Sequence, residues 1–125
     1  MNVLVVAVAL LAGGIGALLR YATTRLFVRL NDELPWAVLV VNTVGSLIGG
    51  VVLGLVTTGA AGAEVQLIVM GGLAGGLTTF STFSAETVQL AIARRWRIVA
   101  ATVGANLVLG LAAAILGFAV VGGFS

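Results

Sequence analysis

The residues best suited to chemistry are concentrated in one short segment, residues 75–86, which ends in a carboxylate. Within it, two phenylalanines and five hydroxyl side chains share seven consecutive residues. Phe80 and Phe83 are three positions apart, so on a helix they lie on roughly one face. The edge of an aromatic ring is the positive part of its quadrupole, and two such edges could meet an anion without a formal charge. Hydroxyl donors stand nearby at Ser81, Thr82 and Ser84.

A glycine-rich run, residues 71–79, overlaps the start of this segment and contains four glycines and two β-branched threonines. These residues make a helix locally weak. As one straight helix, Val65 to Ala93 would measure ~44 Å, whereas a bilayer core is ~30 Å thick. We therefore predict a helix break near 75–79. Carbonyls freed inside a membrane must face protein or a polar cavity, where they can hold a small cation, so a break there implies a site or a pore.

The composition places the whole chain in a membrane. Of its 125 residues, 61% are hydrophobic and 8% are charged, whereas soluble domains carry about a quarter charged residues. The chain has no cysteine and no histidine, which excludes thiol chemistry, disulfides and imidazole metal ligands. No span contains an aspartate, so an intramembrane enzyme is not expected. Six arginines without a basic cluster give no nucleic-acid surface.

Four uncharged stretches are long enough to cross a bilayer. The predicted fold class is an all-α integral membrane protein with one domain, residues 1–125. Its predicted helices cover about residues 2–30, 35–58, 65–93 (broken near 75–79) and 98–121. The first is expected to be a retained helix, because no basic region precedes it. In the second, Gly45 with Gly49 and Gly50 with Gly54 are spaced for close helix packing.

Three further polar side chains have two interpretations each. Asn42 and Asn106 lie inside apolar spans, where a buried amide must be paired. Each could bond a neighbouring helix, or present its NH2 donors to an anion in transit. Glu86 could face the ion path, or lie at headgroup level at the end of its span.

Taken together, these residues resemble the small fluoride channel family of bacteria and archaea, called Fluc or CrcB. The resemblance covers nearly the whole chain. It is carried by residues 13–21 (GGIGALLRY), by Pro35-Trp36 with residues 41–46 (VNTVGS), and by residues 75–86 with their TTFSTFS core.

The resemblance implies an antiparallel dimer with two narrow pores that exports fluoride passively across the inner (cytoplasmic) membrane and so gives fluoride resistance. It implies that Phe80 and Phe83 are ring-edge fluoride ligands and that Asn42 controls their approach. The remaining pore residues would be Ser81, Thr82, Glu86 and Asn106. It also implies a structural sodium ion at the dimer centre, on the backbone carbonyls of Gly76 and Thr79, with Gly75 and Thr78 as near alternatives.

Two features depart from the family pattern. The family usually has a hydroxyl track at four-residue spacing on the fourth helix, where this chain has Asn106, Gly110 and Ala114. In addition, all six arginines fall on one side of a four-span chain. The positive-inside rule then predicts a single orientation with both termini outside. The partner is therefore expected to be either a second copy or a related chain inserted the opposite way.

Two other functions fit the composition. A proton-coupled exporter resembling the small multidrug resistance proteins needs a carboxylate in its first helix, and residues 3–19 contain none. A structural subunit that only packs its glycine faces in a larger complex would conduct no ion.

Overall fold

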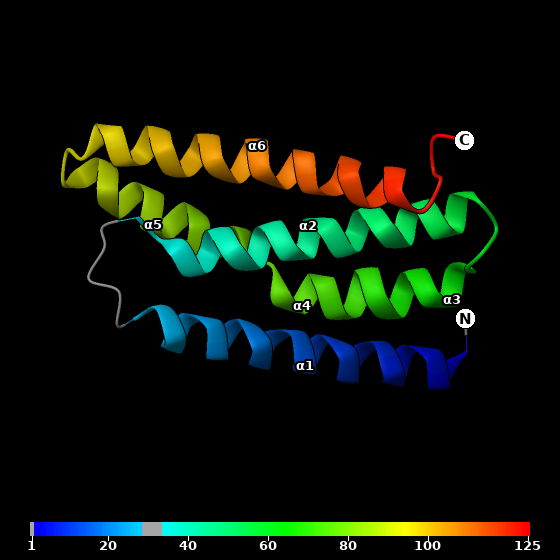
Figure 1. Ribbon diagram of the computed structural model, residues 1–125. Helices are drawn as coiled ribbons and strands as arrows, with labels where there is room; N and C mark the ends of the chain where they lie inside the picture. Colours follow the sequence, from blue (N-terminus) through cyan, green and yellow to red (C-terminus); the bar gives the residue numbers. More distant parts are fainter. Residues whose placement is uncertain (1, 29–33) are drawn as a thin grey trace.

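The computed structural model describes residues 2–28 and 34–125 and contains four long helical segments side by side (Figure 1). The first two are α1 (Val3–Phe27) and α2 (Trp36–Thr57), and the last is α6 (Trp96–Val120). The third, Ala63–Ile92, is divided into α3 (Ala63–Val65), η1 (Gln66–Ala74), α4 (Gly75–Leu77) and α5 (Phe80–Ile92). All four are long and apolar enough to cross a membrane, and the described residues form no strand. The predicted fold class is confirmed.

The helix ends differ from the predicted ones by a few residues. Pro35 is the N-cap of α2 rather than part of its first turn, and α6 begins at Trp96, two residues early. The predicted end of the first helix at Leu30, together with Arg29 and the polar turn 31–33, lies outside the described residues.

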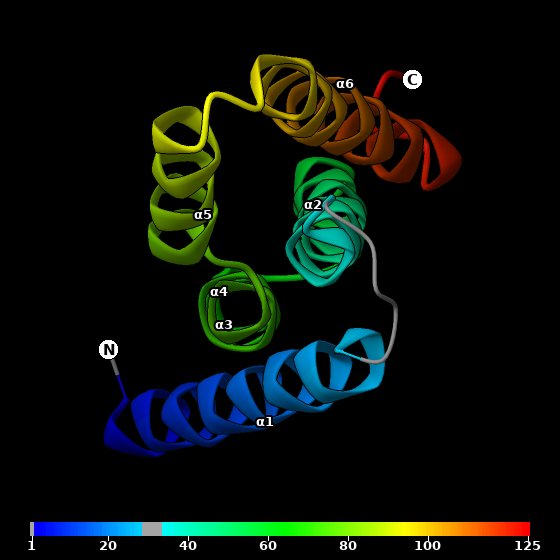
Figure 2. The same cartoon turned by 90° about the vertical axis from the view of Figure 1, so that its left-hand side faces the viewer.

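The predicted break in the third helix is confirmed, and it falls on two residues. Thr78 (φ −81°, ψ 158°) and Thr79 (φ −149°, ψ 121°) are extended between α4 and α5. Threonine suits both positions, because its branched side chain favours extended backbone and its hydroxyl can cap a helix. The Thr79 Oγ accepts from the Thr82 N–H at 3.1 Å. In Figure 2, α3 and α4 are seen end-on while α5 turns away from their axis.

Before the break, residues Gln66–Ala74 form a π-helix, which the sequence analysis did not predict. A π-helix bonds i to i+5, is rare, and is found disproportionately at functional sites. It directly precedes the short α4. Because a π-helix has more residues per turn than an α-helix, it changes the rotation of α4 about the helix axis just before the break.

Glycines allow the spans to pack backbone against backbone. A Cβ on Gly76 would strike the Gly13 carbonyl of α1, and one on Gly72 would lie 2.5 Å from the Ala9 carbonyl. On α2, a Cβ on Gly45 would strike the Thr78 side chain at the break. The predicted packing role is therefore confirmed for Gly45, Gly50 and Gly54, whereas a Cβ on Gly49 would make only an ordinary contact with Met70 at 3.8 Å, and Gly45 leaves room for the break itself.

Helices α2 and α6 run in the same direction in a constant register (Figure 1). Asn42 bonds Asn106, Ser46 lies beside Gly110, and Gly50 and Gly54 face the backbones of Ala114 and Phe118. Members of each pair are 64 positions apart along the chain. Gly110 and Ala114, which replace the expected hydroxyls, are thus the small residues that let α2 approach α6.

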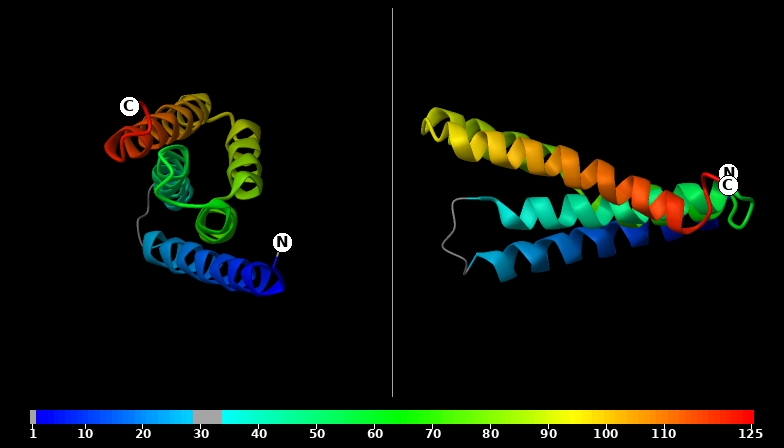
Figure 3. Two further views of the ribbon diagram at one scale, coloured as in Figure 1. Left: turned by 90° about the vertical axis from the view of Figure 1, so that its right-hand side faces the viewer. Right: turned by 45° about the horizontal axis from the view of Figure 1, so that its top comes forward.

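The described arginines all lie at one end of the bundle. They stand in the second half of α1 and around the turn from α5 to α6, whereas the start of α1 and the end of α6 lie at the opposite end of the bundle, on different sides of it (Figure 3). They are Arg20, Arg25, Arg94, Arg95 and Arg97. The predicted one-sided distribution therefore holds for the five described arginines.

Candidate functional site

The helix break is held in place by the side chain of Asn42. The Thr79 N–H donates to Asn42 Oδ1 at 2.8 Å, and Asn42 Nδ2 donates to the Thr79 carbonyl at 3.1 Å. A continuous helix would have paired the Thr79 N–H with the Gly75 carbonyl. Asn42 thus replaces backbone hydrogen bonds that the break removes, as a low-dielectric environment requires.

Asn42 is bonded in turn to α6. Its Nδ2 also donates to Asn106 Oδ1 at 3.2 Å, and Asn106 Nδ2 donates to the Thr102 carbonyl at 2.8 Å. Thr102 is 1% exposed. Both amides therefore bond a residue of a neighbouring span, as the first of their two interpretations expects. The sequence analysis did not identify Thr102, and its position one turn before Asn106 was the only available signal.

Hydroxyl groups gather at the start of α5. The Thr79 Oγ donates to the Thr82 Oγ at 3.1 Å and lies 3.3 Å from the Ser81 Oγ. The Thr78 hydroxyl instead turns back to the Ala74 carbonyl at 3.0 Å. The Thr78 hydroxyl therefore bonds the helix before the break, and the Thr79 hydroxyl bonds the helix after it.

The two phenylalanines are neighbours, as their spacing predicted. Their ring centroids are 6.1 Å apart and the rings are inclined at 45°. Phe83 is half-buried, but Phe80 is 79% exposed. The ring pair therefore stands at the outer surface of the single chain.

Cavities lie on both sides of the break. One of about 280 Å³ lies towards the arginine end. Its polar lining consists of Arg20, Tyr21, Thr24, Thr79 and Thr82. Another, of about 540 Å³, lies between α2, η1 and α6 and is lined by both Gly75 and Thr78. Arg20, the first arginine of α1, is thus placed beside the hydroxyl cluster.

Glu86 lies on α5, three positions after Phe83. It lines a separate cavity of about 330 Å³ at the arginine end, together with Pro35, Gln89 and Arg95. Its Oε2 is buried and has no hydrogen-bond partner among the described residues.

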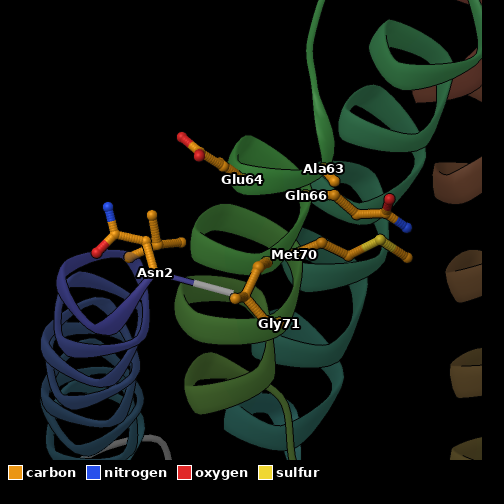
Figure 4. A pocket seen from close by; sticks show the side chains of 8 residues that line it. Asn2, Ala63, Glu64, Gln66, Met70 and Gly71 are labelled. Carbon is orange, nitrogen blue, oxygen red and sulfur yellow. The ribbon is translucent and has the colours of Figure 1, made fainter.

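The largest of the described cavities lies far from the break. It has a volume of about 580 Å³ and lies between the start of α1 and the π-helix, bordered by Asn2, Glu64, Gln66 and Met70 (Figure 4). Its lining is mostly apolar, which suits contact with lipid tails better than with an ion. Within the described residues there is also no cluster of three carboxylate, cysteine or histidine side chains that could hold a metal.

Comparison with known proteins gives a consistent result. The family described as "CrcB-like protein, Camphor Resistance (CrcB)" matches residues 7–118. A protein of Thermobifida fusca named "Fluoride-specific ion channel FluC 1" is 44% identical over 110 residues, covering 87% of this chain and 88% of that one. A Streptomyces avermitilis protein of the same name is 38% identical, covering 82% and 84%. A Novosphingobium aromaticivorans protein named "Fluoride-specific ion channel FluC" is 34% identical, covering 90% and 92%. With its four apolar helices and broken third span, the chain belongs to the CrcB-like family.

Proposed function

We propose that this chain is a fluoride-selective channel that lets fluoride leave the cell passively and so gives fluoride resistance. The observation that carries the proposal is the helix break, which brings a hydroxyl cluster and a phenylalanine pair together at one place in the membrane. Relatives that match more than four fifths of the chain are named as fluoride-specific channels. No cofactor chemistry or catalytic residue is needed for passive flux.

The proposed path begins at the arginine end. Arg20 attracts anions into the cavity that it shares with Thr82. The Thr82 hydroxyl in this cavity, and the Ser81 hydroxyl beside the same cluster, replace part of the hydration shell. The ion then passes the edges of Phe80 and Phe83, where binding is weak enough for release because no formal charge is present. Glu86 and Asn106 are further residues proposed to border the path.

The proposed channel requires a second subunit. A ring that is 79% exposed in the single chain would face lipid tails and could not line a pore. A partner packed over Phe80 would enclose it. We propose the antiparallel arrangement, which places equivalent breaks at the same depth. The partner is proposed to be a second copy of this chain or a related chain. The related chain, inserted the opposite way, is proposed because the described arginines lie at one end of the bundle.

Topology labelling tests the choice of partner. The chain has no cysteine, so Gly62→Cys and Ala93→Cys each introduce a single thiol, one at each end of the bundle. We expect an impermeant maleimide added to intact cells to label Gly62→Cys and not Ala93→Cys. Equal labelling of both from outside would show that the chain inserts both ways, and would favour a homodimer.

We also propose a sodium ion at the subunit interface, held by backbone carbonyls of the break. The Thr79 carbonyl already accepts a hydrogen bond from Asn42, while the Gly75 carbonyl has lost the Thr79 N–H. Gly75 and Thr78 also line one cavity. We therefore favour the Gly75 and Thr78 carbonyls over those of Gly76 and Thr79. Unwound carbonyls of this kind coordinate sodium in other membrane proteins. When bound, the ion would neutralise facing carbonyl dipoles.

Sodium removal should therefore lower flux and weaken dimerisation. When sodium is replaced by N-methylglucamine on both sides, we expect the dimer dissociation constant to rise about tenfold, the equivalent of ~1.4 kcal/mol of interface stabilisation, and fluoride efflux to fall as dimers are lost. Lithium and potassium serve as size controls. Unchanged flux after exhaustive sodium removal would exclude this ion from the active assembly.

The direct test is fluoride efflux from proteoliposomes that contain the purified protein. We expect fluoride to leave rapidly and chloride to be retained, with no requirement for a proton gradient. An absent fluoride flux, both alone and with an oppositely inserted relative, would favour the structural-subunit alternative. Flux that requires a proton gradient would favour an exporter, although residues 3–27 of α1 contain no carboxylate.

A further inference from the structure

Asn106 stands in a chain of hydrogen bonds whose direction is fixed at one end. Its Nδ2 donates to the Thr102 carbonyl at 2.8 Å and lies 3.4 Å from the Thr102 Oγ. A carbonyl can only accept, so the NH2 group of Asn106 must face Thr102. Its Oδ1 must then face α2, where it meets the Asn42 amide at 3.2 Å.

Asn106 and the two backbone groups of Thr79 require the same orientation of Asn42. Because Asn106 Oδ1 can only accept, Asn42 must turn its NH2 group towards it, and the same group then reaches the Thr79 carbonyl at 3.1 Å. Asn42 Oδ1 is left to accept the Thr79 N–H at 2.8 Å. If the Asn42 amide were rotated by 180°, its NH2 group would face the Thr79 N–H, and its Oδ1 would face the Thr79 carbonyl and Asn106 Oδ1. One orientation satisfies all three contacts and the other satisfies none.

We propose that Asn106 is a positioning residue, which acts through Asn42 to fix the backbone of the helix break. It holds the Asn42 amide in the orientation that clamps both polar groups of Thr79. Since Thr79 directly precedes the phenylalanine pair, α6 thereby sets where α5 begins. Both hydrogens of the Asn42 NH2 group face acceptors in this arrangement, one on Thr79 and one on Asn106. Asn42 therefore affects the ion path by positioning the break and not by binding the ion.

The effect of Asn106 on conduction rests on the proposed function, but its effect on the break does not. Hydrogen exchange at the Thr79 amide measures the clamp directly. We expect Asn106→Leu, which has a similar volume and no acceptor, to speed exchange of this amide about five- to tenfold, the equivalent of one lost hydrogen bond. Exchange would be followed in a peptide covering residues 77–81, from protein in nanodiscs.

Thr43→Val is the matched control. Thr43 neighbours Asn42 on α2, and its buried Oγ has no hydrogen-bond partner among the described residues. Valine has nearly the same shape, so exchange at Thr79 should remain at the wild-type rate. If Asn106→Leu does not yield homogeneous protein, Asn106→Ala removes the same acceptor without overpacking the site.

A double-variant comparison separates positioning from general packing. Asn42→Ala removes the clamp itself, so adding Asn106→Leu should leave Thr79 exchange and fluoride efflux unchanged from Asn42→Ala alone. Effects that multiply in the double variant would overturn the proposal, because they would mean that Asn106 acts independently, either as an ion ligand or as packing. Wild-type exchange in Asn106→Leu would overturn it as well.

The flux measurement distinguishes this proposal from the proposed function. In a conducting wild-type protein, Asn106→Leu should lower fluoride efflux at least about tenfold, in step with faster Thr79 exchange. A non-conducting wild-type protein would refute the proposed function, and the exchange result would still decide the role of Asn106. Unchanged flux together with unchanged exchange would refute the positioning role in a working channel.

Discussion

Replacing Phe83 with isoleucine is expected to reduce fluoride efflux from proteoliposomes by up to about tenfold. Isoleucine keeps an apolar side chain but has no ring edge. A favourable edge contact is worth up to ~1.5 kcal/mol, and ~1.4 kcal/mol corresponds to tenfold in rate. Phe80→Ile should have an effect of similar size, because the two rings are neighbours at 6.1 Å. Initial rates would be measured with a fluoride electrode after a potassium ionophore is added, which lets potassium leave with fluoride and balances the charge.

A second phenylalanine pair supplies the control. Phe124 is 70% exposed and packs edge-on against Phe118 at 4.7 Å, near the C-terminus. Phe124→Ile removes a similarly exposed ring that does not belong to the phenylalanine pair of α5, and efflux should stay near the wild-type rate. Wild-type efflux in both Phe80→Ile and Phe83→Ile would contradict the ring-edge mechanism even if the protein conducts fluoride. Chloride retention and the elution volume of each variant verify that the assembly is intact.

The break could be predicted from sequence because its determinants are local. Glycines weaken the helix, β-branched threonines favour extended backbone, and Thr79 can cap the helix that begins at Phe80. The spacing of Phe80 and Phe83 likewise implied that the rings would be neighbours. The four spans were predictable from hydropathy, since a bilayer core requires long apolar segments.

Contacts between distant parts of the chain could not be predicted in this way. The sequence shows two polar amides at positions 42 and 106, but their bond depends on α2 and α6 running in the same direction at one register. The π-helix was missed because no residue pattern in Gln66–Ala74 distinguishes it from an α-helix. The different partners of the Thr78 and Thr79 hydroxyls, Ala74 before the break and Thr82 after it, depend on the exact position of the break.

The α2–α6 register makes a second large effect predictable, at Gly50. A Cβ there would strike the carbonyl oxygen of Ala114. It would also lie 2.8 Å from the carbonyl carbon and 2.9 Å from the Cα of Ala114. These are backbone atoms, which cannot rotate away as a side chain would. Gly50→Ala should therefore force the helices apart, at a cost of ~1–3 kcal/mol. We expect a lower melting temperature in detergent and less protein in the folded peak on gel filtration.

Gly104→Ala is the matched control for Gly50→Ala. It makes the same chemical change on α6, where a Cβ would meet nothing within 4 Å. Because alanine favours a helix by ~1 kcal/mol over glycine, this variant should be as stable as the wild type or more so. Equal stability of the two variants would contradict the close approach of α2 and α6 at Gly50.

The consequence of Gly50→Ala should also reach the break. Gly50 lies eight residues from Asn42 on α2, about 12 Å along the helix at 1.5 Å per residue. The same register that brings Gly50 to Ala114 brings Asn42 to Asn106. Separating the helices at one pair should therefore loosen the other, so Gly50→Ala should speed exchange of the Thr79 amide as well as lower the melting temperature. Lost stability with wild-type Thr79 exchange would mean that the two pairs act independently, and that Asn106 positions the break without help from the glycines.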